Sequence, residues 1–289
     1  MTAVKAVGKN DDLVYDVGMH QGEDSDFYLK KGFRVVGFEA DPDLAAQCRR
    51  RFFGEIESGQ LVVVEGAIVD KQALAGGDKT IRFYKNIDVS VWGTVAEGWA
   101  QRNELLGTSN NIIEVPMVDF SACLQEFGIP HYLKIDIEGM DRACLEALLE
   151  FERKPDYVSI ESEKVSFAKL LLELDLLSQL GYTKFKVVQQ SGIARQKEPK
   201  PAREGDYVGY RFQEGASGLF GEDVPGRWVG LQKNINMYKS IFLQYKLFGD
   251  YALLRRNIFT RTLINGMQRM LRTPLPGWYD THAKHSSAG

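Results

Sequence analysis

The residues best suited to chemistry lie in a glycine turn near the N-terminus. Residues 16–22 read Asp-Val-Gly-Met-His-Gln-Gly and end an apolar strand predicted near 13–17. Gly18 and Gly22 let a ligand lie against bare backbone, and the helix that follows offers free N–H groups and a positive dipole end. A second apolar strand, near 34–38, is followed by Glu39, whose carboxylate can accept both hydroxyls of a ribose. These features predict a pocket for an adenosine-containing cofactor.

The spacing of the glycines distinguishes between two such cofactors. The dinucleotide fingerprint Gly-x-Gly-x-x-Gly, which is built to approach a pyrophosphate, is absent from this turn. Asp16 stands just before the turn, where its negative charge would repel a diphosphate but attract the ammonium of a methionine-like moiety. The pattern therefore favours S-adenosylmethionine (SAM) over NAD. An ordinary βαβ turn without a ligand is the structural alternative.

A second set of charged residues lies on a strand near 131–137. Lys134, Asp136 and Glu138 alternate with apolar residues, so the pleat points them to one side until the strand ends. Charges on a central strand are costly unless they are paired or bound to a ligand. Lys134 could simply pair with one of the two carboxylates. The functional interpretation is that Asp136 lies over a reacting centre.

The elements that position these residues alternate along the first two thirds of the chain. Strands are predicted near 13–17, 34–38, 61–67, 80–84, 131–137, 156–161 and 182–189. Helices are predicted near 22–31, 42–53, 118–127, 140–150 and 166–180. This alternation is typical of a doubly wound α/β sheet, in which ligands bind beyond the carboxyl ends of the strands. Asp16, Glu39, Gly66, Asp136 and Glu161 occupy such ends.

The composition and the predicted secondary structure of the sequence change at about residue 190. Residues 191–227 predict a long loop rich in Gly, Pro and charge, and residues 231–272 look helical. We therefore expect two parts, a core over 1–190 and a C-terminal extension over 191–289, with 283–289 disordered. The helical part carries the basic residues Lys239, Lys246, Arg255, Arg256, Arg261, Arg269 and Arg272. They suit a solvated helix face, a cover over the acceptor cleft, a homodimer surface, or a peripheral contact with an anionic membrane or phosphate-bearing carrier.

The composition of the chain limits the classes of protein to which it can belong. The 289 residues are 44% hydrophobic and 26% charged, as in ordinary globular proteins, and the net charge of −3 gives no sign of a nucleic-acid partner. Cys48, Cys123 and Cys144 match neither a disulfide framework nor a metal site, so we expect buried thiols. We see neither a signal peptide nor a transmembrane run, and we expect a cytoplasmic protein.

Several motifs together resemble the FkbM-type SAM-dependent methyltransferases. They are residues 16–22, Phe-Glu-Ala-Asp-Pro at 38–42, Ser-Val-Trp-Gly-Thr at 90–94, Lys-Ile-Asp-Ile-Glu-Gly at 134–139 and Ser-Ile-Glu at 159–161. The resemblance covers roughly residues 12–190. It implies a Rossmann-like class I methyltransferase fold, with a seven-stranded sheet whose last strand is antiparallel. It also implies O-methylation of hydroxyls on sugars, polysaccharides or other natural products.

The resemblance also implies roles for individual residues. The turn would hold the methionine part of SAM through Asp16, Gly18, Met19, His20 and Gly22. Glu39 would hold the ribose, Asp136 would lie at the reacting centre, and the exit at Gly66-Ala67 would flank the adenine. Many methyltransferases carry an acidic residue at that exit, and here a backbone amide or Asp119 is the alternative.

Methyl transfer to a hydroxyl needs a group that removes a proton. Candidates for the catalytic set are His20, Lys134, Asp136 and Glu138. Candidate contacts to the acceptor are Trp92, Glu161 and His282, the last as part of a lid. A divalent metal held by Asp136, Glu138 and Glu161 is conceivable but not favoured, because nothing in the spacing demands one. The alternatives are an NAD-linked oxidoreductase and a non-catalytic SAM-binding protein.

Overall fold

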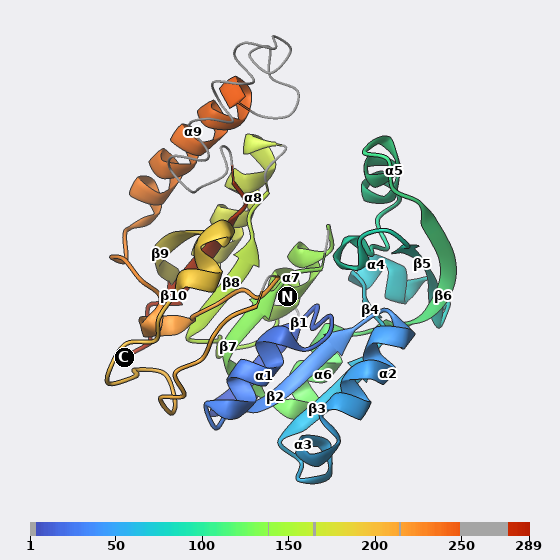
Figure 1. Cartoon of the computed structure of the whole chain (residues 1–289), viewed down its shortest axis with the longest axis horizontal. Helices are drawn as coiled ribbons and strands as arrows, with labels where there is room; N and C mark the ends of the chain where they lie inside the picture. The colour runs from blue at the N-terminus through green and yellow to red at the C-terminus, as the bar shows by residue number, and fades with distance from the viewer. Residues whose placement is uncertain (1–3, 138, 164–165, 214, 249–276) are drawn as a thin grey trace.

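Seven strands form the central sheet of the computed structural model, in the order β3-β2-β1-β7-β8-β10-β9 (Figure 1). The structure describes residues 4–137, 139–163, 166–213, 215–248 and 277–289. The strands are β1 (Lys9–Val17), β2 (Arg34–Glu39), β3 (Leu61–Glu65), β7 (Ile129–Ile135), β8 (Tyr157–Glu161), β9 (Tyr182–Gln189) and β10 (Tyr279–His285). β10 runs antiparallel to both its neighbours, whereas β3, β2, β1, β7 and β8 pair in parallel. This arrangement confirms the predicted class I methyltransferase sheet.

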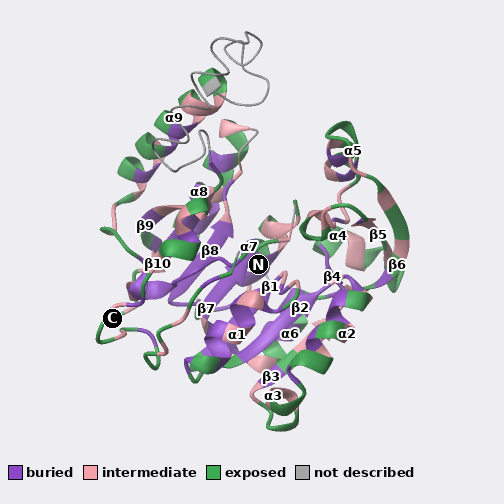
Figure 2. Cartoon of the chain, viewed as in Figure 1, coloured by how far each residue is buried: buried purple, intermediate pink, exposed green. Residues whose placement is uncertain are grey.

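The described residues form nine α-helices, and those that pack on this sheet cover both of its faces. The nine helices are α1 (Glu23–Lys30), α2 (Pro42–Arg51), α3 (Phe53–Glu57), α4 (Lys71–Ala75), α5 (Glu97–Leu105), α6 (Phe120–Phe127), α7 (Asp141–Leu148), α8 (Phe167–Gln179) and α9 (Leu231–Phe248). Residues of α6, α7, α8 and α9 share one apolar cluster with the sheet, and residues of α1 and α2 share another. Burial is therefore concentrated in the strands, as Figure 2 shows. The strand order reverses around β1 and β7, and this is where ligands bind in doubly wound sheets.

A small second sheet was only partly predicted. β4 (Ala67–Ile68), β5 (Thr80–Asn86) and β6 (Asn110–Val118) form it in the order β4-β6-β5, and the short 3-10 helix η1 (Ser90–Trp92) and α5 lie between β5 and β6. The predicted strand at 61–67 is broken at Gly66, where a Cβ would lie 2.6 Å from the Pro116 carbonyl oxygen. β6 escaped prediction because it contains Pro116 and buries few of its residues.

The C-terminal residues correct one prediction. Residues 283–285 are not disordered, because they belong to β10, where Ala283 is completely buried between β8 and β9. β10 therefore joins the central sheet from beyond the predicted boundary at residue 190. The described residues between β9 and β10 belong to an insertion between these two neighbouring strands. The described part of this insertion contains η2 (Gln190–Arg195), η3 (Gly221–Asp223) and α9. Of the predicted basic residues, Lys239 and Lys246 lie within the described ranges, whereas Arg255 to Arg272 lie outside them.

The long loop before α9 packs on the protein rather than extending into solvent. The ammonium of Lys31, at the end of α1, is fully buried between Glu198 and Asp223. The Phe220 ring stacks on Tyr132 of β7 at 4.6 Å between ring centroids. These contacts hold the loop against α1 and β7.

Two further predictions can be compared with the structure. Cys48, Cys123 and Cys144 are free and buried, as expected. None of the helices in the described ranges is long and apolar enough to span a membrane.

His131 lies at the opposite end of β7 from the predicted ligand edge. Its Nδ1 is 2.8 Å from Asp156 Oδ2 and its Nε2 is 2.8 Å from Glu204 Oε2. Burial lowers the pKa of His131, but the two carboxylates outweigh burial and raise it to about 9. Because the folded pKa exceeds the unfolded value, this stabilisation is complete below about pH 6.5 and is lost as the pH rises toward 9.

We therefore expect the destabilisation caused by His131→Gln to shrink by about 3 kcal/mol between pH 6 and pH 9.5. Urea unfolding of both proteins across this pH range measures the difference. A difference that stays constant with pH would show that the folded protein does not hold His131 as a cation.

Candidate active site

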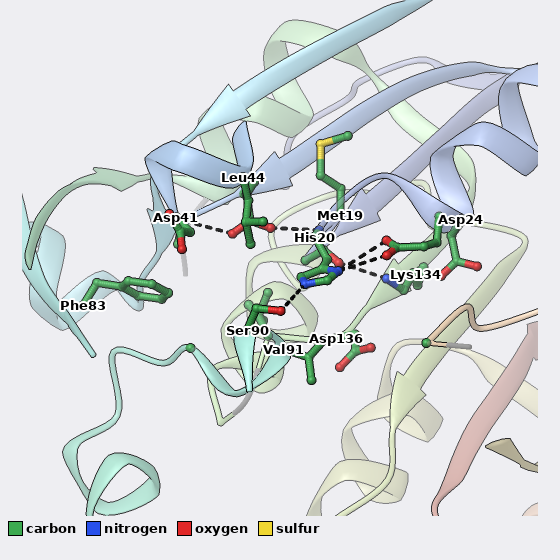
Figure 3. A pocket seen from close by; sticks show the side chains of 17 residues that line it. Met19, His20, Asp24, Asp41, Leu44, Phe83, Ser90, Val91, Lys134 and Asp136 are labelled. Atoms are coloured by element: carbon green, nitrogen blue, oxygen red, sulfur yellow. Dashed lines mark hydrogen bonds and ion pairs between the residues drawn. The ribbon is translucent and has the colours of Figure 1, made fainter. Parts of the chain in front are cut away.

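A cavity opens at the carboxyl ends of β1, β2 and β7 (Figure 3). Six of the predicted site residues line it: Gly18, Met19, His20, Glu39, Lys134 and Asp136. The structure thus brings together the two motifs that the sequence placed more than a hundred residues apart. Glu138 lies outside the described residues.

The turn after β1 has a geometry that requires glycine at Gly18. Its φ is +82°, and a Cβ there would lie 2.0 Å from the Asp136 carbonyl oxygen. The Asp136 N–H donates to the Val17 carbonyl at 2.9 Å, so the turn and the end of β7 are in direct backbone contact. Gly22 has a packing role instead, because a Cβ there would strike the Phe52 ring, and it does not line the cavity.

Glu39 is buried at the end of β2, with each oxygen accepting a backbone N–H. The donors are His20 and Asp41, both at 2.8 Å. Burial raises the pKa of Glu39 to about 7, although the two N–H donors act in the opposite direction. The carboxylate is thereby fixed at the cavity wall, in the position that the sequence assigned to a ribose contact.

Lys134 and Asp16 form a buried ion pair beneath the turn. Lys134 Nζ lies 3.0 Å from Asp16 Oδ1, 3.0 Å from the Gly18 carbonyl oxygen and 3.5 Å from an oxygen of Asp24. Asp16 also accepts the Ser25 hydroxyl and is fully buried. Asp16 therefore faces the chain's own ammonium and does not line the cavity, whereas the sequence had placed a ligand ammonium beside it. Burial lowers the pKa of Lys134, but Asp16 and Asp24 outweigh it and keep the pKa well above its usual value.

Asp136 points into the cavity and is exposed there. The surrounding protein raises its pKa to about 7; Lys134 opposes this shift, whereas Glu161 adds to it. Carboxyl groups with pKa values near neutrality are common among groups that exchange protons in active sites.

The C-terminal insertion contributes to the wall of the cavity. The Ser217 N–H donates to both oxygens of Asp24, at 2.8 and 3.0 Å, and Gly215 lines the cavity. Burial raises the pKa of Asp24 to about 6, and Lys134 acts against this shift. Sequence reasoning missed these residues; the acidic run directly after Gly22 was the available signal for Asp24, and nothing local signalled Gly215.

Apolar residues also line the cavity. They are Ala40, Leu44, Phe83 and Val91. Ala67 does not line the cavity but is buried behind it, in one cluster with Phe83 and Val115. Asp119 caps α6 by accepting the Ser121 N–H and borders a different hollow. Ala67 and Asp119, the two residues considered for the adenine contact, therefore do not line the cavity, whereas Phe83 from β5 does.

The three predicted acceptor contacts lie outside this cavity. Glu161, at the end of β8, lines a neighbouring cavity with Asp141 and Glu173. Trp92 belongs to η1, where its carbonyl accepts the Asn103 side chain. His282 is only 2% exposed inside β10, and burial lowers its pKa to about 3. The lid role predicted for His282 is wrong because its strand is an interior strand of the sheet.

Within the described ranges, one group of side chains has its potential ligand atoms close enough to hold a metal ion. It consists of Asp11, His131 and Asp156, near the amino ends of β1, β7 and β8. It is therefore remote from the cavity, and Asp136 and Glu161 do not belong to it.

Solved structures of several methyltransferases are similar to this chain. Among solved structures, the chain is similar to a SAM-dependent methyltransferase from Geobacter sulfurreducens in complex with S-adenosyl-L-homocysteine, with 11% identity, 96% of this chain and 86% of that chain covered, and a TM-score of 0.36. It is also similar to a precorrin-6y C5,15-methyltransferase from Geobacter metallireducens, with 12% identity, 63% and 69% covered, and a TM-score of 0.35. Scores this low carry no argument about this chain. No curated protein matches it.

The family assignment comes from the sequence itself. Residues 16–184 match the methyltransferase FkbM domain, and this match spans more than half of the chain. It begins at Asp16 and includes Glu39, Lys134 and Asp136, which are the residues that converge on the cavity. The chain therefore belongs to the FkbM family of SAM-dependent methyltransferases.

Proposed function

We propose that this methyltransferase transfers the methyl group of SAM to a hydroxyl of a small molecule, a saccharide or a glycoconjugate. The observation that carries the proposal is the placement of Asp136. Its carboxylate faces the same cavity that Gly18 and Glu39 line, and desolvation by the cavity walls raises its pKa to about 7. A carboxylate there can accept a hydrogen bond from a hydroxyl that approaches the donor.

The cavity offers a place for each part of SAM. Glu39 suits the two ribose hydroxyls, because a carboxylate can accept both. The apolar side chains of Leu44 and Phe83, which line the cavity, suit the adenine ring. Lys134 lines the cavity near the turn, where its ammonium attracts the methionine carboxylate. SAM supplies an activated methyl group, and the residues around the cavity bind and orient it.

The chemistry that remains for the protein is alignment and proton removal. Methyl transfer from a sulfonium is an in-line displacement, so holding the acceptor oxygen in line with the methyl group can supply about 7–11 kcal/mol. A hydroxyl must also lose its proton as the new bond forms, and a positioned base contributes roughly 10²–10⁴-fold. In a saccharide, Asp136 can hold one hydroxyl while the neighbouring hydroxyl reacts.

The test is incubation of the purified protein with SAM that carries a radiolabelled methyl group and with a panel of glycosides, polyols and phenols. We expect the label in alkali-stable methyl ethers, with loss of transfer when each acceptor's hydroxyls are blocked. Label found only on nitrogen or carbon, or only in alkali-labile esters, would contradict the assignment to hydroxyls.

A further inference from the structure

The side chain of His20 is held from both of its ring nitrogens. Nδ1 lies 3.1 Å from Glu23 Oε1, and Nε2 lies 2.8 Å from the Ser90 hydroxyl. All three residues line the cavity of the proposed active site, and they come from the turn after β1, the start of α1 and the start of η1. Figure 3 shows the hydrogen bond between His20 and Ser90. The hydroxyl, imidazole and carboxylate therefore stand in one line of hydrogen bonds.

The partners of the ring set its tautomer. An ionised carboxylate only accepts hydrogen bonds, so Nδ1 of His20 must carry a hydrogen toward Glu23. In the neutral ring, Nε2 is then the acceptor, and the Ser90 hydroxyl donates to it. Glu23 is itself fixed, because its Oε2 accepts the Gln21 N–H at 3.1 Å. The lone pair of Nε2 is thus aimed at a hydroxyl group in the cavity.

The backbone of His20 is constrained as well. Its φ is +51°, and among the residues that the structure describes it is the one non-glycine residue with a positive φ. Its N–H donates to Glu39 Oε2. Left-handed backbone at a side chain other than glycine is uncommon and often occurs at functional sites. The turn therefore holds the imidazole next to the proposed ribose contact at the expense of an easier conformation.

Ser90 differs from Glu23 in its surroundings. It is exposed and lies on the connection between β5 and β6, outside the central sheet. An exposed hydroxyl on such a segment can be replaced by another hydroxyl at little cost. Its oxygen marks a position, 2.8 Å from Nε2, where an acceptor hydroxyl would find the same hydrogen bond.

We propose that His20 accepts the proton of the acceptor hydroxyl through Nε2, that Glu23 is the positioning residue that fixes its tautomer, and that the acceptor hydroxyl takes the place of the Ser90 hydroxyl. In the step, the acceptor oxygen bonds to the methyl carbon and the carbon–sulfur bond breaks. The electron pair stays on sulfur, which becomes a neutral thioether, and the hydroxyl proton passes to Nε2. The resulting imidazolium is paired with Glu23. This inference rests on the proposed O-methylation.

The charges around His20 determine how this step depends on pH. Burial lowers the pKa of His20, but Glu23 from α1 and Glu39 from β2 outweigh it, against an opposing effect of Lys134 from β7, and the net shift is upward. Since the base must be neutral, methyl transfer should increase as the pH rises through this pKa. Glu23→Gln removes the main source of the upward shift, so the acidic limb of the kcat/KM profile should move to lower pH.

Replacement of His20 by glycine gives the sharpest test, because glycine accepts the φ of this position and leaves space for a free base. We expect His20→Gly to lose about 10²-fold in kcat, and added imidazole to restore part of the rate. Ser90→Ala removes the hydroxyl that the acceptor displaces, so it should reduce kcat far less than His20→Gly does. Asp26→Asn, which removes one negative charge from the same helix as Glu23, is the matched control and should leave the pH profile unchanged.

Three results would overturn the proposal: full activity of His20→Gly, a loss that imidazole does not rescue while binding of S-adenosyl-L-homocysteine is intact, or a pH profile that Glu23→Gln does not move. A loss of kcat in Ser90→Ala as large as that in His20→Gly would contradict the place assigned to the acceptor. A wild-type protein that binds SAM but methylates no hydroxyl contradicts the proposed function itself, and this inference with it.

Discussion

Asp136→Asn should reduce methyl transfer about 10²-fold while leaving the affinity for SAM nearly unchanged. The amide has the size of the carboxylate, but it loses the charge-assisted hydrogen bond to the acceptor, which is worth about 1.5–3 kcal/mol. Misplacement of the acceptor oxygen adds to the loss, because small errors in alignment reduce rates strongly. Single-turnover rates and titration with S-adenosyl-L-homocysteine measure the two effects separately.

Asp43→Asn is the matched control for this variant. Asp43 is an exposed residue of α2 that pairs with Lys85, so its replacement removes one negative charge without touching the cavity. We expect normal turnover in the control. Unchanged turnover in Asp136→Asn would remove Asp136 from the mechanism. A folded variant that loses both turnover and SAM binding would instead assign Asp136 to the cofactor.

Glu39→Ala should weaken SAM binding about 30-fold or more. The Glu39 carboxylate at the end of β2 can accept both ribose hydroxyls, and each hydrogen bond to a charged group contributes about 1.5–3 kcal/mol. The pKa of Glu39 is raised to about 7, and the hydroxyls donate to its ionised form. The affinity of the wild-type protein for SAM should therefore increase as the pH rises through 7.

Two further variants separate the loss of the ribose contact from effects on folding and charge. Glu39 accepts the N–H groups of His20 and Asp41, so Glu39→Ala leaves both donors without this partner. Glu39→Gln keeps an acceptor for one of them and should weaken binding less. Glu65→Gln, at the end of β3 beside Arg49, is the control for loss of charge. A dissociation constant that Glu39→Ala leaves unaltered would disprove the ribose assignment.

The core of the fold was predictable because its signals are local. Alternating strands and helices indicated a doubly wound sheet, and that sheet brings the ends of β1, β2 and β7 together. This is why Gly18, Glu39 and Asp136 could be assigned to one site from the sequence. The absence of the dinucleotide glycine spacing from the same turn also favoured SAM over NAD.

The parts that escaped prediction depend on contacts between distant segments. β10 has a polar sequence that reads as a tail, yet it fills the gap between β8 and β9. Asp16 was assigned to the ligand because its pairing with Lys134, 118 residues away, cannot be seen in a local pattern. The same holds for Ser217 at Asp24 and for Phe83, which reach the cavity from the insertion and from the small sheet.

The central claim is that this cavity binds SAM, and titration calorimetry of the full chain tests it most directly. SAM, S-adenosyl-L-homocysteine and NAD would be titrated in turn into the wild-type protein and into Glu39→Ala. We expect saturable binding of SAM and S-adenosyl-L-homocysteine, no binding of NAD, and a clear loss of affinity in the variant. Binding of NAD alone would contradict the account, and it would make Asp136 a candidate for redox chemistry in place of methyl transfer.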